Sequence, residues 1–149
     1  MMATMQDALR GRCLCGAVRF TVTPPTDFAS HCHCESCRRA HAAPFVTWTS
    51  VPEARCALLD GAAAVRTYAS SPGVLRSFCG TCGTPLFFRG DDAPGRTYVP
   101  VATLVDPLDR PIEGHVSYEE HVAWLEGVEQ LPCTRGKTGH RVPWIEGGG

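Results

Sequence analysis

Residues 31–41 read His-Cys-His-Cys-Glu-Ser-Cys-Arg-Arg-Ala-His, and this stretch decides how the rest of the chain is interpreted. Its three thiols, Cys32, Cys34 and Cys37, fall within six residues and have histidines around them. A hydrophobic core has no need of so many soft ligands, whereas zinc binds thiolate sulfur and imidazole nitrogen in a tetrahedron. The stretch therefore predicts a zinc site with three cysteine ligands. A vacant fourth position is typical of a catalytic zinc.

The chemistry expected of this triplet is the capture of a thiol rather than the activation of water. Three thiolates on Zn²⁺ leave a net charge of about −1, so the metal is a weaker Lewis acid than one bound by three neutral imidazoles. A thiol is a soft donor that suits such a site and would be deprotonated there. The alternative is a closed structural site in which an imidazole from His31, His33 or His41 takes the fourth position.

The paired cysteines elsewhere in the chain predict a second, closed site made of four thiolates, which would come from Cys13, Cys15, Cys79 and Cys82. Gly80 and Gly83 suit the tight turn of the second pair, because glycine permits the positive φ angles that such a turn requires. Four buried thiols without a metal are the alternative. Of the nine cysteines, only Cys56 and Cys133 remain unassigned, and we expect both to be bystanders. The alternative for Cys133, beside Pro132 in a late loop, is an exposed thiol that reaches the open zinc.

Composition and charge narrow the function further. The chain has 149 residues, 44% hydrophobic and 19% charged, which are values of a globular domain. Its net charge of −1 lacks the positive field of a nucleic-acid binder, and no stretch approaches the length of a membrane span. Residues 1–10 do not read as a signal peptide, so nine cysteines indicate a cytoplasmic protein with reduced thiols.

The pattern along the chain predicts a mostly β fold of several short antiparallel strands with little helix. Strands are expected at residues 18–22, 28–33, 45–50, 65–69, 74–78, 85–89, 98–105 and 115–118. A short helix is expected over residues 35–41, and residues 51–64 are ambiguous. Pro100 should place its strand at an edge or a bulge. We divide the chain into an N-terminal extension (1–10), a zinc-binding domain (11–134) and a C-terminal tail (135–149).

The sequence resembles the glutathione-dependent formaldehyde-activating enzyme family, also called the centromere protein V family. The matching pieces, in order and spacing, are Cys13-Leu-Cys15-Gly16, His31-Cys32-His33-Cys34-x-x-Cys37-Arg38, Ala43-Pro44-Phe45, Phe78-Cys79-x-x-Cys82-Gly83-Thr84-Pro85-Leu86 and Trp124. They span most of the chain, from about residue 11 to about residue 130.

The resemblance implies a β-tent fold with two zinc ions per chain. The structural ion would be bound by the four paired cysteines and the catalytic ion by Cys32, Cys34 and Cys37. The family's activity is the condensation of glutathione with formaldehyde to S-hydroxymethylglutathione, formally a carbon–sulfur lyase reaction in reverse. The implied partners are thus a small thiol and a small aldehyde. Homo-oligomer formation is left open.

Other residues are weighed against ordinary structural roles. Arg38, Arg39 and His41 could bind the carboxylates of a glutathione-like ligand, with plain surface charge as an equal alternative. Trp48 and Trp124 are expected to pack rather than to line a pocket.

Two functions other than thiol-adduct chemistry stay open. One is a non-catalytic protein-interaction module held together by zinc. The other is a relative of the methionine sulfoxide reductases with Cys133 as nucleophile, which the vacant triplet disfavours because such enzymes need a single structural zinc.

Overall fold

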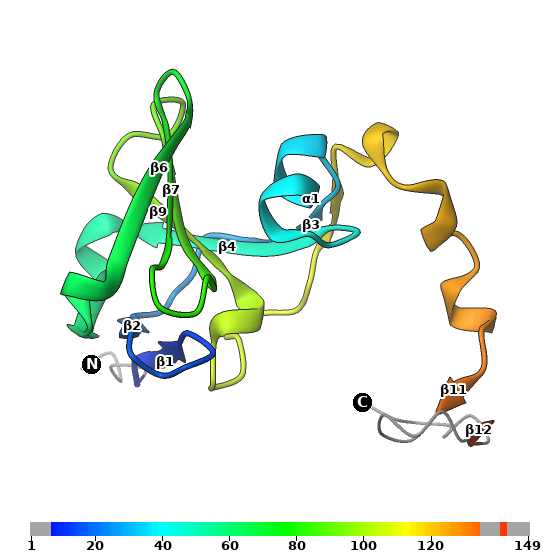
Figure 1. Ribbon diagram of the computed structural model, residues 1–149, viewed down its shortest axis with the longest axis horizontal. Helices are drawn as coiled ribbons and strands as arrows, with labels where there is room; N and C mark the ends of the chain where they lie inside the picture. Colours follow the sequence, from blue (N-terminus) through cyan, green and yellow to red (C-terminus); the bar gives the residue numbers. More distant parts are fainter. Residues whose placement is uncertain (1–6, 135–140, 143–149) are drawn as a thin grey trace, which may run out of the picture.

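Two β-sheets form the body of the protein in the computed structural model, which describes residues 7–134 and 141–142 (Figure 1). The smaller sheet has the order β1 (Leu9–Arg12), β2 (Arg19–Val22) and β5 (Cys56–Asp60). The larger sheet has the order β10 (Gly114–Val116), β3 (Ala29–Cys32), β4 (Val46–Pro52), β9 (Arg96–Pro100), β8 (Pro85–Gly90), β7 (Val74–Cys79) and β6 (Val65–Ser71). A separate pair is formed by β11 (Cys133–Thr134) and β12 (Arg141–Val142). Within the sheets only β10 runs parallel to its neighbour, so the predicted mostly β, antiparallel class is confirmed.

One α-helix, α1 (Glu35–His41), is present in the described part of the chain, with the predicted bounds. The thiol of Cys34 caps its N-terminus by accepting a hydrogen bond from the backbone N–H of Cys37, and Ala42 ends it in the left-handed conformation. Short 3₁₀ turns connect other elements, at Glu53–Arg55, Ala62–Ala64, Val101–Thr103, Tyr118–Glu120, Ala123–Leu125 and Val128–Gln130.

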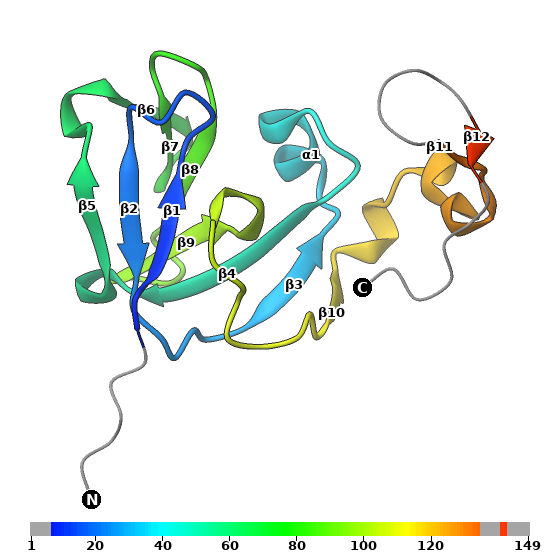
Figure 2. The same ribbon diagram turned by 90° about the horizontal axis from the view of Figure 1, so that it is seen from below.

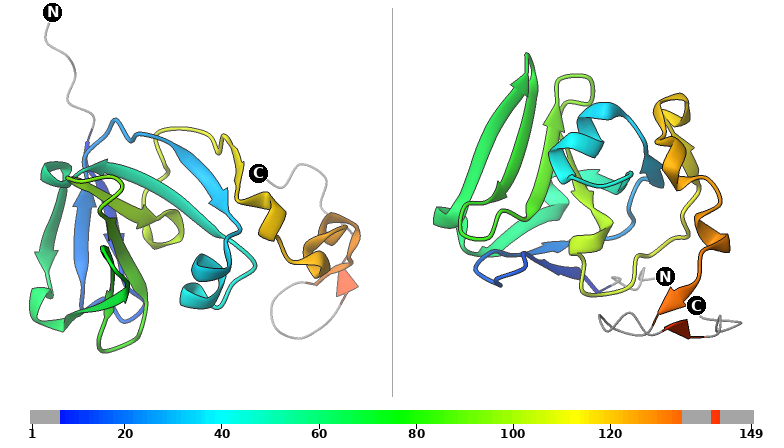
Figure 3. Two further views of the ribbon diagram at one scale, coloured as in Figure 1. Left: turned by 90° about the horizontal axis from the view of Figure 1, so that it is seen from above. Right: turned by 45° about the vertical axis from the view of Figure 1, so that its right-hand side comes forward.

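The hydrophobic core lies between the two sheets, which face each other at an inclination that matches the expected β-tent (Figures 2 and 3). Val18, Phe20 and Val22 are fully buried while Arg19 is exposed, as the alternating pattern predicts. The Phe20 ring meets the Phe87 ring edge to face, with 5.1 Å between centroids. Burial of one such side chain contributes about 1.5–3 kcal/mol to stability.

The region of β9 differs from the prediction. A strand was expected over residues 98–105, but β9 ends at Pro100 and a 3₁₀ turn follows. The expected edge position is also wrong, because β9 lies between β4 and β8. β8 pairs with β9 only at Tyr98. The pairing of β8 with β9 has therefore ended before Pro100, whose lack of an N–H costs no hydrogen bond to β8. The ambiguous residues 51–64 contain β5 and two 3₁₀ turns.

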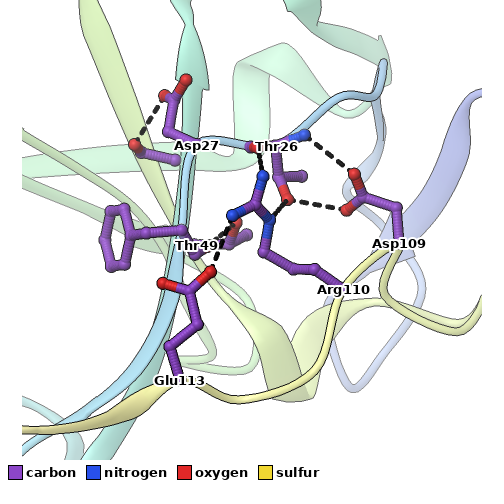
Figure 4. Close-up of polar contacts among 8 residues, drawn as sticks. Thr26, Asp27, Thr49, Asp109, Arg110 and Glu113 are labelled. Atoms are coloured by element: carbon purple, nitrogen blue, oxygen red, sulfur yellow. Dashed lines mark hydrogen bonds and ion pairs between the residues drawn. The ribbon is translucent and has the colours of Figure 1, made fainter.

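A polar network around Arg110 fixes the connection between β9 and β10 (Figure 4). Thr26 donates its hydroxyl to Asp109 Oδ1 at 2.6 Å and its backbone N–H to Oδ2 at 2.9 Å. Arg110 donates to the Thr26 hydroxyl at 3.0 Å and to Glu113 at 2.7 Å, and it also contacts the Thr26 carbonyl. Because Thr26 is buried, these bonds satisfy polar groups that water does not reach. The network stabilises β10 beside β3, the strand that leads into the cysteine triplet.

Residues 117–134 leave the larger sheet and run past α1 as three 3₁₀ turns and β11 (Figure 3). Trp124 in this segment is 69% exposed, so the expectation that it packs in the fold is wrong. Trp48 is buried as expected, but it also lines a pocket, which was not expected. The predicted tail, 135–149, lies outside the described residues apart from β12. Within the described residues, no helix combines the length and the apolar character that crossing a membrane requires.

Candidate metal centres

The four paired cysteines come together where the β1–β2 turn meets the β7–β8 turn. The ligand atoms of Cys13, Cys15, Cys79 and Cys82 all lie within 4.8 Å of one another. The Sγ atoms of Cys13 and Cys15 are 3.6 Å apart, and those of Cys15 and Cys79 are 3.9 Å apart. Zinc–sulfur bonds of about 2.3 Å place tetrahedral sulfurs about 3.8 Å apart. A disulfide needs about 2.05 Å, so these separations fit a shared metal ion and not a cross-link.

The backbone around this cluster is shaped for thiolates. Val18 donates its N–H to the Cys13 sulfur at 3.3 Å. A hydrogen bond with the Thr84 hydroxyl, together with backbone amides, lowers the pKa of Cys82 to about 5. Gly83 has the expected positive φ of +81°, but Gly80 does not. Gly80 is required for space instead, because a Cβ there would lie 2.9 Å from the Ala64 carbonyl oxygen.

The triplet assembles at the junction of β3 and α1. Cys32 is the last residue of β3, Cys34 caps the helix and Cys37 lies in its first turn, and their sulfurs lie within 4.8 Å of one another. The hydrogen bond with Cys32, with smaller effects from Cys34, the Trp48 indole and the charge of Arg76, lowers the pKa of Cys37 to about 5 against the effect of burial. The same contact raises the pKa of Cys32. Burial raises the pKa of Cys34 as well, so without a metal ion the triplet favours a single thiolate, at Cys37, and a bound cation would be needed to hold all three sulfurs as thiolates.

The ring nitrogens of the three candidate histidines do not lie among the ligand atoms gathered at the triplet. His31 Nδ1 lies 2.8 Å from the Thr47 hydroxyl, and the buried His33 places Nε2 at 2.7 Å from His115 Nδ1. His41 packs edge-on against Trp48, with 5.2 Å between ring centroids. In the part of the chain that the structure describes, the ligand atoms gathered at the triplet come from three cysteines.

A pocket of about 780 Å³ opens beside the triplet, between α1 and strands β6, β7 and β8. Ser36, which precedes a triplet cysteine, and Trp48, which contacts Cys37, are among its lining residues. Gly83, next to the four-cysteine cluster, lines it as well. A volume of this size accepts a small organic ligand.

The residues expected to bind a ligand are divided between two pockets. Arg39 and His41 line the large pocket, where Arg39 also pairs with Glu35 at 2.8 Å. Burial lowers the pKa of His41 to about 4, so this imidazole is neutral near pH 7 and offers hydrogen bonds rather than charge. Arg38 donates to the His33 carbonyl at 3.0 Å and lines an adjoining pocket of about 310 Å³, which also contains Trp124.

Arg76 of β7 also lines the large pocket, and the sequence interpretation missed it. The alternation of side chains along β7 could have indicated this position. In β7 the neighbouring Leu75 is 46% exposed, while Arg76 is half-buried on the opposite face. An arginine on the inward face of a strand indicates a specific role for its charge.

The fold and the two cysteine clusters define a mostly β protein with two candidate metal centres and an adjacent ligand pocket. The model of the glutathione-dependent formaldehyde-activating enzyme family matches residues 8–141, and the chain belongs to this family. The family match therefore agrees with the family that the cysteine motifs of the sequence resemble.

Individual relatives support the assignment. A protein of Halomonas elongata, described as a putative glutathione-dependent formaldehyde-activating enzyme, is 31% identical over 139 residues, covering 86% of this chain and 87% of the relative. An uncharacterised lyase of Schizosaccharomyces pombe is 35% identical over 78 residues, covering 52% of this chain and 55% of the relative, so that match spans about half of the yeast protein. The crystal structure of a Rhodobacter sphaeroides protein is 25% identical, with a TM-score of 0.60, over 72% of this chain and 99% of that chain.

Proposed function

We propose that this protein is a zinc-dependent carbon–sulfur lyase, or a synthase in the reverse direction, that acts on the adduct of glutathione with formaldehyde or a related small aldehyde. In the synthetic direction the thiolate sulfur forms a bond to the carbonyl carbon. The proton lost from the thiol ends on the former carbonyl oxygen, which gives S-hydroxymethylglutathione. Family membership and the description of the Halomonas elongata relative support this reaction class.

The observation that carries the proposal is a cluster of three sulfurs, with no imidazole gathered among the described ligand atoms, beside a pocket of ligand size. We assign a catalytic zinc to Cys32, Cys34 and Cys37. Zinc bound there would supply the positive charge that keeps an entering thiol deprotonated at pH 7. A structural zinc is assigned to the four paired cysteines, so we propose two zinc ions per chain.

The protein's own side chains bind and orient the thiol. Trp48 and Phe88 form apolar walls of the pocket, against which the ligand would pack. Arg39 and His41 offer polar contacts to the peptide part of the ligand, and Arg38 offers one at the adjoining pocket. We place the reaction in the cytoplasm, because the seven cysteines assigned to zinc must stay reduced to bind it and reducing conditions preserve them.

The test is exchange NMR of glutathione and formaldehyde, which measures the rate of adduct formation above the spontaneous rate. The zinc-loaded protein should accelerate exchange, and Cys34→Ser should return the rate to background. Cys133→Ser is the matched control, because Cys133 is exposed and belongs to neither cluster, and it should keep full activity. Full activity of Cys34→Ser would contradict the assignment.

A second function, a zinc-stabilised protein-interaction module without chemistry, is favoured by one observation. The segment after β10 exposes Trp124 (69%), Val128 (48%) and Leu131 (59%). Exposed apolar residues close together are typical of an interaction surface. The exchange experiment separates the two functions, because a module would leave the spontaneous rate unchanged while still binding two zinc ions.

A further inference from the structure

Arg76 is a cation in the large pocket that has no carboxylate partner among the described residues. Its Nε donates to the Ser70 hydroxyl at 3.1 Å, and its guanidinium carbon lies 4.9 Å from the centre of the Phe88 ring. Its Nη1 is buried and finds no hydrogen-bond partner among residues 7–134 and 141–142. No carboxylate of the described residues forms an ion pair with it, whereas Arg39, which also lines the pocket, is paired with Glu35.

Such an arrangement is costly for the empty protein. A buried donor of a charged group that lacks a partner loses its hydration without compensation. The guanidinium is also held in place, because the Ser70 bond and the Phe88 ring restrict its orientation. A fixed guanidinium with a free N–H is suited to an oxyanion that accepts two parallel hydrogen bonds, a carboxylate or a phosphate, and of these a small peptide thiol carries the carboxylate.

The position of Arg76 relates it to the thiol site. Its guanidinium lies over the Phe88 ring, the Phe88 ring lies 5.8 Å from the Trp48 ring, and Trp48 packs in one cluster with Cys37. A ligand that placed a carboxylate on Arg76 would occupy the same pocket as Trp48 and Ser36, the residues that adjoin the triplet.

We propose that Arg76 is the carboxylate-binding residue of this pocket and that it selects thiols carrying a carboxylate, such as γ-glutamyl peptides, over neutral or cationic thiols. The selection of a thiol rests on the proposed function. The carboxylate site itself does not, because it is defined by a buried donor and a pocket.

A different role for Arg76 makes a distinct prediction. If the charge of Arg76 served only to compensate the negative charge of the triplet, Arg76→Lys, which keeps that charge, would bind the acid as the wild type does. A carboxylate-binding guanidinium instead loses its paired hydrogen bonds in Arg76→Lys as well as in Arg76→Gln, and only ligands that carry the carboxylate are weakened by Arg76→Lys. Arg76→Lys, measured on the acid and on its ester, therefore separates the two roles.

The experiment measures binding of S-methylglutathione and its diethyl ester to the zinc-loaded full chain by calorimetry. S-methylglutathione has no free thiol, so its binding requires no thiol chemistry. Arg76→Gln should bind the acid about 10- to 100-fold more weakly than the wild type does, because it loses a charged hydrogen bond. Both proteins should bind the ester alike.

Two variants control for folding. Arg89→Gln changes an arginine of the neighbouring strand that pairs with Glu53 at the surface and does not line this pocket, so it should bind the acid as the wild type does. Arg76→Lys keeps the charge without the fork and should give an intermediate loss for the acid. If Arg76→Gln fails to fold, the acid and ester affinities of Arg76→Lys test the proposal in its place.

Absence of S-methylglutathione binding to the wild type, or an equal loss of acid and ester binding in both Arg76 variants, would overturn the inference. The proposed function is judged separately by the exchange rate. If the wild type shows the Arg76-dependent preference for the acid but does not accelerate exchange, the carboxylate site is supported and the proposed enzymatic function is contradicted.

Discussion

Removal of the ion proposed for the four-cysteine cluster should lower the free energy of unfolding by about 4 kcal/mol. The ion would connect Cys15 to Cys79, which are 64 positions apart. Closing a loop of that length restricts the unfolded chain by about 4 kcal/mol at 25 °C in the chain-entropy treatment of cross-links. For a chain of this size each kcal/mol shifts the Tm by about 2–4 °C, so the transition should fall by about 8–16 °C.

The assay is urea and thermal unfolding followed by circular dichroism, on zinc-loaded protein, on chelator-treated protein and on Cys79→Ser. Cys79 is fully buried, and replacing it removes one sulfur of the cluster. Cys133→Ser should unfold as the wild type does, because Cys133 is exposed. If Cys79→Ser and chelator treatment each changed stability by less than about 1 kcal/mol, the cluster would not cross-link the two turns and the reasoning would be refuted.

Three further predictions concern the fold. Gly11→Ala should cost about 1–3 kcal/mol in urea unfolding, because the new Cβ would lie 2.2 Å from the Phe20 ring; unchanged stability would show that the ring moves freely. Arg110→Met should cost about 1.5–3 kcal/mol, because it removes charged hydrogen bonds to the buried Thr26; a loss below 0.5 kcal/mol by the same assay would place the network outside the stable fold. Asp106 accepts hydrogen bonds from Arg10 of β1, and these lower the pKa of the Asp106 carboxyl to about 2. The ion pair therefore stabilises the fold above about pH 4, and this stabilisation is lost as the pH falls to about 2. The difference in urea midpoint between wild type and Asp106→Asn should therefore close over that range, and a pH-independent difference would contradict the ion pair.

Features set by neighbouring residues could be predicted from the sequence. The helix over residues 35–41 follows from its local composition and from Pro44 shortly after its end. The pairing of the cysteine motifs into two clusters follows from spacing and from the chemistry of zinc ligands. Gly83 adopts the expected positive φ because the turn that holds Cys82 depends on its own few residues.

Features set by contacts between distant segments could not be predicted. Gly80 is required by the carbonyl of Ala64, which only the fold brings within reach. The engagement of His33 depends on β10 running parallel to β3, a pairing that short-range patterns do not encode. The role of Arg76 in the pocket could not be predicted either, because the pocket is formed by α1 and three strands that only the fold brings together.

The central claim, that the triplet binds zinc through three protein sulfurs and receives a thiol as the fourth, is tested most directly by zinc-edge X-ray absorption with and without glutathione. The account predicts two zinc ions per chain, with the average number of sulfurs per zinc rising from about 3.5 to about 4 when glutathione is added. A spectrum that shows a nitrogen ligand from the protein and does not change with glutathione would contradict it.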